Sequence, residues 1–498
     1  MTPMTRRQFV GTLTATAAAA SLPASALGGL FGGKKPKMNV LFLMSDDCRV
    51  ELGCYGSRFK AHTPNIDALA KSGVRFDRNY CQFPLCNPSR ASLMTGRRPI
   101  ITGVLGNRTD FRKLHPDWTS LPQLFKENGY VSLRSGKIFH GGIDDPKAWT
   151  EAAGWDATDE GGAQSHDLGR VRNQGNPTSL PSTNSAAALP QDLTRAQYSD
   201  RIIVLDGNGE GHGDYHTADR TIEYLRQYKD QPFFIGCGFV KPHSPPTAPQ
   251  KFFDLYDVNK IELPADFAAL PTVPPGFPSA AIRKKNADLF IGRSASPQEA
   301  REVIQAYLAS ISWMDWNVGR VIAELDALGL RQKTIIVFVA DHGYQLGEKG
   351  KWSKAGSLFE MGTRVPMLMV VPDAKGNGRV CPRMVESLDI YPTLVELCGL
   401  PLPAELEGQS LVPLLKKPEA PLDRPAFSVW SEDGKTLHGV AVRVERWRYA
   451  EFADGGAMLL DMDNDPQELK NVADDPANKA VRDRLSKLIK DYQKDFHA

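Results

Sequence analysis

The sequence predicts an α/β protein with a large, doubly wound and mostly parallel sheet, followed by a smaller α+β module. Three continuous apolar runs, at 38–47, 232–243 and 334–343, each end in charged or polar residues. Runs of this kind are typical of parallel strands that are covered on both faces. Amphipathic stretches separate the runs and supply the alternation of strand and helix that such folds require. Helices are therefore predicted at 65–72, 121–128, 217–228, 298–328 and 389–398.

Shorter alternating stretches predict the C-terminal module. The proline-rich segment KKPEAPLDRP leads into AFSVWSE, HGVAVRVE, RWRYAEF and AMLLDMD, which alternate as short antiparallel strands do. A polar helix is expected at about 476–494. Two other stretches, 155–215 and 259–297, lack periodicity, and we expect irregular structure there, the first as a long surface excursion.

The first 33 residues are expected to be an export signal and linker. Arg6 and Arg7 resemble a twin-arginine signal, and the small residues at 24–26 fit a cleavage site. The alanine-rich run between them is too short to make a good spanning helix, and no other segment has the required length and apolarity. We expect an exported protein, periplasmic or extracellular, without a membrane span. The predicted division is 1–33 for the signal, 34–415 for the main domain and 416–498 for the C-terminal subdomain.

The balance of charged residues limits the kinds of molecule that the protein can bind. The chain has 60 basic and 58 acidic residues, and removal of Arg6 and Arg7 leaves 58 of each, a net charge of zero. A neutral protein does not hold polyanions through its bulk field, so we expect no nucleic-acid partner and a local pocket for any anion.

The seven cysteines leave at least one thiol unpaired even after export. No CxxC pair is present, so a zinc knuckle is unsupported. Pairing of Cys48 with Cys54, or of Cys381 with Cys398, is left open.

Acidic residues follow two of the predicted strands. Asp46 and Asp47 end the first run, and Asp341 with His342 ends another. Ligands of open α/β sheets bind beyond the carboxyl ends of the strands. Neighbours on a strand point to opposite faces, so Asp46 and Asp47 reach one ion only if the chain turns there. Each pair alone is better explained as a strand-end cap, but together they favour a hard cation such as Ca²⁺ or Mg²⁺, with one histidine tolerated.

Cys86 lies in the proline-bracketed turn CNPSR at the mouth of a predicted helix. A thiol there suits four roles: a buried structural group, a metal ligand, a nucleophile, or the precursor of another group.

The turn, with the following ASLMTGRRP, resembles the C-x-P-S-R signature of type I sulfatases in the alkaline-phosphatase superfamily. NVLFLMSDD, SGKIFHGG, VKPHSPP, ADHGYQLGEKGKWSK and LLDMDNDPQELKNVADDP match in order, so the resemblance spans nearly all of 38–475. It implies an alkaline-phosphatase-like fold and hydrolysis of O-sulfate esters on a sulfated saccharide. It also implies a divalent cation, and a formylglycine made from Cys86 by formylglycine-generating machinery before export.

The resemblance further implies the site residues. The metal site would be formed by Asp46, Asp47, Cys86, Asp341 and His342. Catalysis would involve Cys86, Arg90, Lys137, His140, His243, Lys354 and Asp341, and the substrate would meet Lys137, His243, Lys354 and Tyr344.

In this scheme each residue has a distinct task. Arg90 stabilises the hydrated aldehyde, and Asp341 accepts the proton of the attacking hydroxyl. Lys137, His243 and Lys354 bind the sulfate, and His243 or Lys354 protonates the leaving alcohol. His140 removes the second hydroxyl proton.

Taken alone, several of these residues have simpler explanations. Without the resemblance, Lys137, His140 and Lys354 are better explained as ordinary loop residues. The Tyr344 side chain could equally pack in the interior or line a pocket. His212 and His216 have no motif support and are expected to be polar loop residues.

The sequences GKIFH, VKPH and the D-H pair are most similar to iduronate-2-sulfatase and its bacterial relatives. We therefore expect exo action, with 2-O-sulfated iduronate as the first candidate. Arg443, Arg446 and Arg448 would meet a uronate carboxylate at the pocket rim, or else form an exposed strand face. The alternatives are a phosphodiesterase or phosphonate monoester hydrolase of the same superfamily, a non-catalytic glycan-binding protein, and a plain thiol metalloenzyme.

Overall fold

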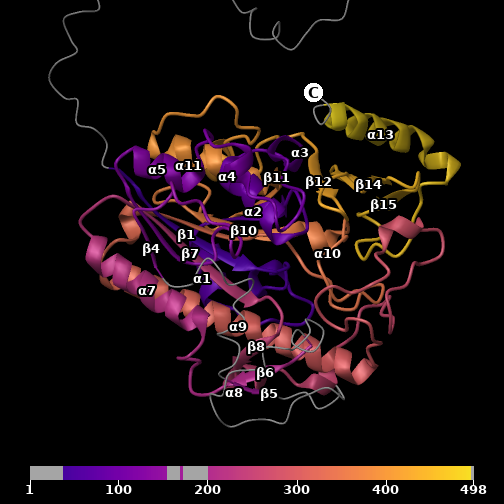
Figure 1. Ribbon diagram of the computed structural model, residues 1–498, viewed down its shortest axis with the longest axis horizontal. Helices are drawn as coiled ribbons and strands as arrows, with labels where there is room; N and C mark the ends of the chain where they lie inside the picture. The colour runs from indigo at the N-terminus through magenta and orange to yellow at the C-terminus, as the bar shows by residue number, and fades with distance from the viewer. Residues whose placement is uncertain (1–36, 154–168, 172–199, 495–498) are drawn as a thin grey trace, which may run out of the picture. The chain divides into compact units, whose positions relative to one another are not determined.

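The computed structural model of the protein describes residues 37–153, 169–171 and 200–494 (Figure 1). Residues Met38–Ala498 form one compact unit. The expected export signal and most of the excursion predicted at 155–215 lie outside the described residues. Within the described ranges, no helix is long and apolar enough to cross a membrane.

An eight-stranded sheet lies at the centre of this unit, in the order β11-β2-β10-β9-β1-β7-β3-β4. The strands are β1 Asn39–Asp46, β2 Val74–Tyr80, β3 Val131–Gly136, β4 Glu151–Ala153, β7 Phe233–Pro242, β9 Thr334–Ala340, β10 Arg364–Val370 and β11 Val380–Glu386. β1 lies between β7 and β9 and runs parallel to both, whereas β10 runs antiparallel to β9 and β2. The three predicted strands are thus the three central ones, and the mostly parallel sheet is confirmed.

Helices cover both faces of this sheet (Figure 1). One face carries α1 Pro64–Ser72, α7 Gly213–Tyr228 and α9 Pro297–Ala327, and the other carries α2 Cys86–Thr95, α5 Leu121–Glu127 and α11 Ile390–Cys398. Leu41 and Leu43 of β1 pack into the core on the first face, while Phe42 and Met44 pack into the core on the second. Because alternate side chains of a strand point to opposite faces, a doubly covered strand needs an apolar residue at every position.

The remaining elements are short. A small three-stranded sheet consists of β5 Gly169–Val171, β6 Ile203–Leu205 and β8 Thr247–Pro249. The short helices are α3 Pro99–Thr102, α4 Phe111–Leu114, α8 Gln250–Phe253, α10 Glu360–Thr363 and α12 Val412–Lys416. The 3₁₀ turns are η2 Gly53–Tyr55, η4 Val258–Lys260, η5 Ser279–Ala281, η6 Arg331–Lys333, η7 Ser387–Asp389 and η8 Pro476–Asn478.

The C-terminal segment forms a four-stranded antiparallel sheet, as predicted. Its strands are β12 Ala426–Trp430, β13 Gly439–Arg443, β14 Trp447–Phe452 and β15 Ala457–Asp461, and α13 Lys479–Gln493 packs against β13 and β14. β12 is tied to the segment before α2, because the amide of Val429 donates to the carbonyl of Gln82 at 2.9 Å. A domain boundary near residue 415 remains our proposal.

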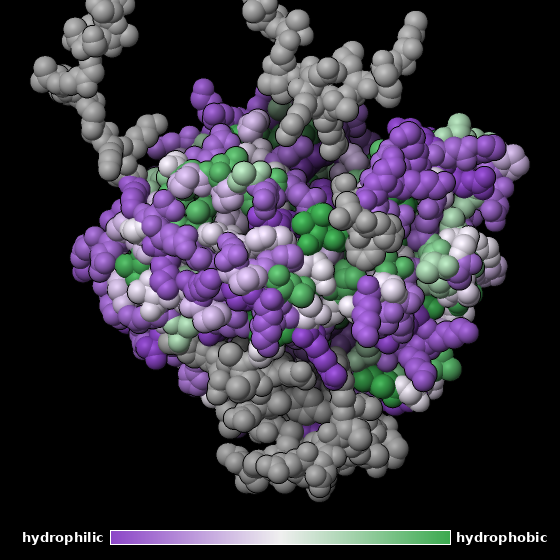
Figure 2. Space-filling model, turned by 45° about the horizontal axis from the view of Figure 1, so that its top comes forward, coloured by the Kyte–Doolittle hydropathy of each residue, from purple (hydrophilic) through white to green (hydrophobic). Residues whose placement is uncertain are grey.

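Polar side chains predominate on the face of the molecule in Figure 2, where hydrophobic residues occur in small groups. The exposed large hydrophobic residues are likewise scattered along the chain: Leu114, Leu255, Leu270, Val380, Leu402 and Leu469.

The structure answers the open question of cysteine pairing and corrects the expectation that His212 and His216 are loop residues. All seven cysteines are free, so neither suggested disulfide forms. His212 is not a surface loop residue, because it caps α7 by accepting the amide of Asp214 at 3.0 Å and packs edge-on against Trp313. His216 lies within α7 on its exposed side.

The arginines of the C-terminal sheet do not reach a pocket rim. Arg448 is buried and pairs with Glu360 and with Glu468, the latter at 3.0 Å. Arg443 is also buried, 3.5 Å from Glu360, whereas Arg446 is exposed and pairs with Asp461. Arg443 and Arg448 therefore belong to a buried ionic network, which neither the pocket-rim nor the exposed-face expectation anticipated.

This network yields a stability prediction. Replacing Arg448 with Met should lower the free energy of unfolding by about 3–5 kcal/mol, because it leaves Glu468 buried without its cation and leaves Glu360 with the longer contact to Arg443, at 3.5 Å. Denaturant unfolding followed by circular dichroism measures the change. The matched control is Arg446→Met, which removes an exposed pair and should leave the unfolding midpoint near that of the wild type. Equal effects of the two variants would contradict the prediction.

Candidate active site

The ends of four neighbouring strands meet at one edge of the sheet. Asp46 is the last residue of β1, Asp341 follows β9, Lys137 follows β3, and His243 follows β7. Because these strands are parallel neighbours, their carboxyl ends converge, as expected for a ligand site in an open α/β sheet. Cys86, at the start of α2, lies at the same edge, with its sulfur 3.5 Å from Oδ1 of Asp46.

The turn required between Asp46 and Asp47 is present. Asp47 has a φ of 60°, in the left-handed region that aspartate tolerates better than most residues. Two contacts hold this conformation: the amide of Asp47 donates to Oδ1 of Asp341 at 3.2 Å, and the Tyr307 hydroxyl donates to the Asp47 carbonyl at 2.6 Å. As a result, both carboxylates reach the group around His342, whose Nε2 lies 3.4 Å from Asp47 and 4.0 Å from Asp46.

These residues form a compact cluster of potential ligands. One donor atom each from Asp46, Cys86, Asp341 and His342 lie within 4.8 Å of one another, and all four residues are buried. Nε2 of His342 is 3.3 Å from the Cys86 sulfur and 3.5 Å from Asp341. Oδ1 of Asp47 is buried and has no hydrogen bond within the described part of the chain. An unsatisfied buried carboxylate oxygen among three carboxylates and an imidazole fits a divalent cation with mainly oxygen ligands.

The ionisation of the cluster supports the same conclusion. Burial raises the pKa of Asp47 well above its ordinary value, and burial also raises the pKa of Asp341. Although burial alone would lower it, Asp341 and Cys86 raise the pKa of His342 to about 10. The cluster thus attracts positive charge, which protonated His342 supplies when no cation is bound.

Two buried cations, Lys137 and Arg90, stabilise the negative charge of the cluster. Burial would raise the pKa of Asp46, but Lys137 and Arg90 outweigh it and hold that pKa well below the usual range. Lys137 is in direct contact with Asp46. Arg90 is fully buried; its Nε donates to Asp341 at 2.9 Å, and its Nη1 donates to the carbonyls of Lys137 and Ile138. Within the described residues only its Nη2 has no hydrogen bond, and this atom lies 3.5 Å from Asp46.

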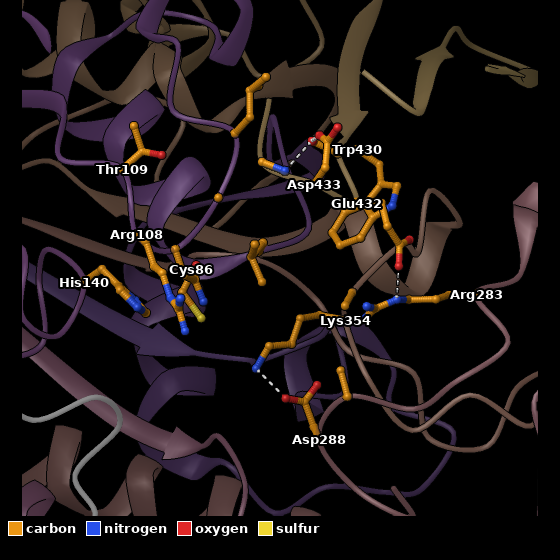
Figure 3. Close-up of a pocket in the computed structure, with 18 of the residues that line it drawn as sticks. Cys86, Arg108, Thr109, His140, Arg283, Asp288, Lys354, Trp430, Glu432 and Asp433 are labelled. Atoms are coloured by element: carbon orange, nitrogen blue, oxygen red, sulfur yellow. Dashed lines mark hydrogen bonds and ion pairs between the residues drawn. The ribbon is translucent and has the colours of Figure 1, made fainter. Parts of the chain in front are cut away.

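A cavity of about 810 Å³ opens in front of this cluster (Figure 3). The predicted residues that line it are Cys86, Lys137, His140, His243 and Lys354. Lys354 donates to Asp47 at 2.9 Å and lies 3.3 Å from Asp288, the contact drawn in Figure 3. Asp288 and Asp47 outweigh burial and raise the pKa of Lys354 well above its ordinary value, so this side chain is a cation.

The two histidines of the cavity wall are neutral in the free protein. Burial, assisted by Lys137, lowers the pKa of His140 to about 3, and its buried Nδ1 has no hydrogen bond to the described residues. Burial and Lys354 lower the pKa of His243 well below its ordinary value. Nδ1 of His243 is 2.7 Å from the carbonyl of Ser244, and its Nε2 is 4.0 Å from Asp47. Both imidazoles are therefore available as proton acceptors.

Tyr344 does not line the cavity. It is buried, stacks on Tyr307, and donates its hydroxyl to the carbonyl of Trp352 at 3.0 Å. Of the two roles expected for it, the structure supports packing.

Sequence analysis gave no role to two other residues at the site. Asp288, the partner of Lys354, lies in the irregular stretch 259–297, where no periodicity or motif marks it. Lys241 is part of the VKPH sequence and is fully buried; its Nζ donates to the carbonyls of His243 and Pro245, each at 2.9 Å, and so fixes the loop that carries His243. Burial lowers the pKa of Lys241 to about 7, although Asp214 opposes the shift.

The fold and this site define an α/β protein in which a cavity lined by buried cations adjoins a candidate metal-binding cluster. The sulfatase family profile matches residues 38–400, and the profile of the C-terminal region of N-sulphoglucosamine sulphohydrolase matches residues 347–495. The protein belongs to the sulfatase family and is a hydrolase of sulfate esters.

Several relatives support this assignment. A sulfatase of Formosa agariphila is 34% identical, covering 91% of this chain and 86% of the relative. Iduronate 2-sulfatase of Mus musculus is 31% identical, covering 88% and 91%. Choline-sulfatase of Rhizobium meliloti is 29% identical, covering 88% and 83%.

Solved structures share the fold. Phosphonate monoester hydrolase of Agrobacterium radiobacter has a TM-score of 0.73 at 23% identity, covering 92% of this chain and 96% of that one. A protein in complex with its substrate D-glucosamine-2-N,6-O-disulfate has a TM-score of 0.71 at 20% identity, covering 93% and 98%. These matches confirm the alkaline-phosphatase-like fold.

The buried cluster predicts metal binding that is measurable without an assay. Elemental analysis after dialysis should find about one hard divalent cation per chain, and adding Ca²⁺ to stripped protein should raise its melting temperature, because a ligand that binds only the folded state stabilises it. Asp341→Asn should abolish both effects. Asp288→Asn, which changes a buried aspartate outside the cluster, should retain them. Stoichiometric zinc, or full metal content in Asp341→Asn, would count against the site.

The low pKa of His140 predicts how stability depends on pH. The unfolded chain takes up a proton at this histidine near its ordinary pKa of 6.5, whereas the folded protein does so only near 3. Because the unfolded state then binds more protons, His140 lowers the stability of the fold as the pH falls below about 6.5. His140→Gln should therefore lose less stability between pH 7 and pH 5 than the wild type, as measured by denaturant unfolding at the two values.

The exposed His216 on α7 provides the matched control. His216→Gln should leave the pH dependence of the wild type unchanged. A stability profile of His140→Gln that parallels the wild type would show that the imidazole is not held neutral.

Proposed function

We propose that the protein removes sulfate from the non-reducing end of a sulfated saccharide, with 2-O-sulfated iduronate as the first candidate sugar. The observation that carries this proposal is the cavity whose wall includes Cys86 and the cations Lys137 and Lys354. A cavity with the reacting residue in its wall suits a chain end. The net charge of zero expected after export also argues against a surface track that grips a long polyanion.

We infer that Asp46, Asp47, Asp341 and His342 hold a divalent cation, and that Cys86 is converted to formylglycine. When bound, the cation would polarise a sulfate oxygen, and the modified residue would supply an oxygen nucleophile where the gene encodes a thiol. The compact donor set and the unsatisfied Oδ1 of Asp47 support the first inference. The motif CNPSR at the mouth of α2 supports the second.

The surrounding side chains then have defined tasks. Lys137 and Lys354 are buried cations on two sides of the cavity and bind the sulfate through charge-assisted hydrogen bonds. Asp341 accepts the proton of the attacking hydroxyl, and Nε of Arg90 orients this carboxylate by donating to its Oδ2 at 2.9 Å. His140 is neutral and accepts a proton at one ring nitrogen.

Protonation of the leaving oxygen falls to His243 or Lys354. Nε2 of His243 faces the cavity floor at Asp47, and an incoming sulfate adds negative charge that favours its protonated form. Lys354 is already charged, but its strongly raised pKa makes it a poor proton donor. We therefore assign the leaving-group proton to His243 and sulfate binding to Lys354.

Two further observations support the proposal of a saccharide substrate. The cavity adjoins a second one of about 610 Å³, and the two share Arg283, Trp430 and Glu432, which leaves room for a neighbouring sugar. Iduronate 2-sulfatases of mouse and human are 31% and 32% identical to this chain.

The test is sulfate release from two short oligosaccharides, one sulfated on its non-reducing terminal uronate and the other only on an internal sugar. The wild type should act on the first. Cys86→Ala should fold normally and lose activity roughly a thousandfold or more, because no nucleophile remains at residue 86. Mass spectrometry of the Cys86 peptide checks that the wild-type thiol has become an aldehyde.

Each alternative has its own signature in this experiment. Preference for internal sulfate would reject exo action, and preference for a phosphonate monoester would favour the phosphonate hydrolase alternative. Saccharide binding without turnover, in protein whose residue 86 is modified, would indicate a glycan-binding protein. Inactivation of unmodified protein by thiol alkylation would indicate a thiol enzyme.

A further inference from the structure

Two loops form the outer wall of the cavity that Cys86 lines. One is the segment 105–109 after α3, and the other is the segment 430–435 between β12 and β13. In Figure 3, Arg108 and Thr109 come from the first loop, and Trp430, Glu432 and Asp433 come from the second. The loops touch, because a Cβ added at Gly106 would lie 3.4 Å from the Cα of Gly434.

Most charged groups on this wall are already compensated. Arg283 pairs with Glu432 at 2.9 Å, and Lys354 lies 3.3 Å from Asp288. The carboxylate of Asp433 is occupied by its own turn, where it accepts the amides of Lys435 and Thr436 and the hydroxyls of Ser431 and Thr436. The two cations of this set are thus paired, whereas Asp433 keeps its negative charge, because all four of its donors are neutral groups.

Two further charged residues of the outer wall are Arg108 and Lys435. Both are exposed, and neither side chain has a hydrogen bond or ion pair among the described residues. The Arg108 side chain points into the cavity on the side of Cys86 and His140 (Figure 3). The outer wall therefore keeps two cations without an ion pair, one from each loop, and one carboxylate without an ion pair, that of Asp433.

The loop that carries Arg108 is fastened directly to the helix that carries Cys86. The side-chain amide of Asn87 donates to the carbonyls of Gly106 and Thr109, at 2.9 and 2.7 Å. The backbone amide of Asn87 donates to the side chain of Asn107 at 3.1 Å. Since Asn87 is the neighbour of Cys86 and these bonds lie on both sides of Arg108, the backbone that carries Arg108 is held close to the reacting residue.

We propose that Arg108 and Lys435 determine specificity by binding a second oxyanion of the substrate, beyond the sulfate that is hydrolysed. The sulfate lies deeper, between the buried cations Lys137 and Lys354, so a second anion on the same molecule meets the outer wall. A carboxylate or a second sulfate suits the planar donor fork of Arg108 equally well. The inference rests on the proposed function for its substrate class, and it disfavours esters whose remaining part is cationic.

The test compares kcat/KM of the wild type, Arg108→Gln and Lys435→Gln on three aryl sulfates: 4-nitrophenyl sulfate, 4-carboxyphenyl sulfate and a benzene disulfate. Each variant is compared with the wild type on the same substrate, so the intrinsic reactivities of the esters cancel. Arg108→Gln should lose roughly tenfold to hundredfold more on the doubly charged esters than on 4-nitrophenyl sulfate, as for a lost charge-assisted hydrogen bond. The loss should appear mainly in KM.

Arg484→Gln is the matched control, because it removes an exposed arginine of α13 outside the cavity and should give wild-type values on all three esters. Comparing the losses of kcat/KM on 4-carboxyphenyl sulfate and on the benzene disulfate shows whether the outer wall prefers a carboxylate or a second sulfate. Equal losses on all three esters would overturn the proposal, because Arg108 would then act on the hydrolysed sulfate. This outcome is distinct from failure of the proposed function, which would appear as a wild type that is active on aryl sulfates but inactive on the terminally sulfated oligosaccharide.

Discussion

The constraint on which this structure depends is the burial of three carboxylates at one point of the sheet. Asp46, Asp47 and Asp341 repel one another, and burial strengthens that repulsion because little water screens it. Arg90 bridges Asp341 and Asp46, while Lys137 and Lys354 each contact one carboxylate. This arrangement is stable only with compensating cations on every side.

The same compensation gives the site its chemistry. Lys137 and Arg90 keep Asp46 ionised, as a metal ligand has to be. Lys137 and Lys354 also line the cavity, where our proposal has them bind the incoming oxyanion. The low pKa of each cavity histidine follows from the same crowding, because burial and a nearby lysine both disfavour the imidazolium. One set of charges therefore stabilises the fold, prepares the metal site and tunes the proton acceptors.

The C-terminal sheet completes the cavity rather than standing apart from it. Its loop between β12 and β13 supplies part of the outer wall, next to the loop that Asn87 fastens to α2. Its buried arginines, Arg443 and Arg448, serve a different purpose, since they hold Glu360. Two loops that are far apart in the sequence are thus in contact in the fold, and our proposal assigns substrate preference to them.

The sequence alone determined the central strands, the covering helices and the motif residues around Cys86, because doubly buried strands require unbroken apolar runs and the motifs lie at the strand ends. Only the tertiary structure decided which cations are compensated. Asp288 lies in a stretch without periodicity, Lys241 fixes the His243 loop through carbonyls that no pattern specifies, and Arg443 and Arg448 alternate like surface residues yet are buried. Pairing of charges depends on distances between segments remote in the chain, and local sequence patterns do not encode those distances.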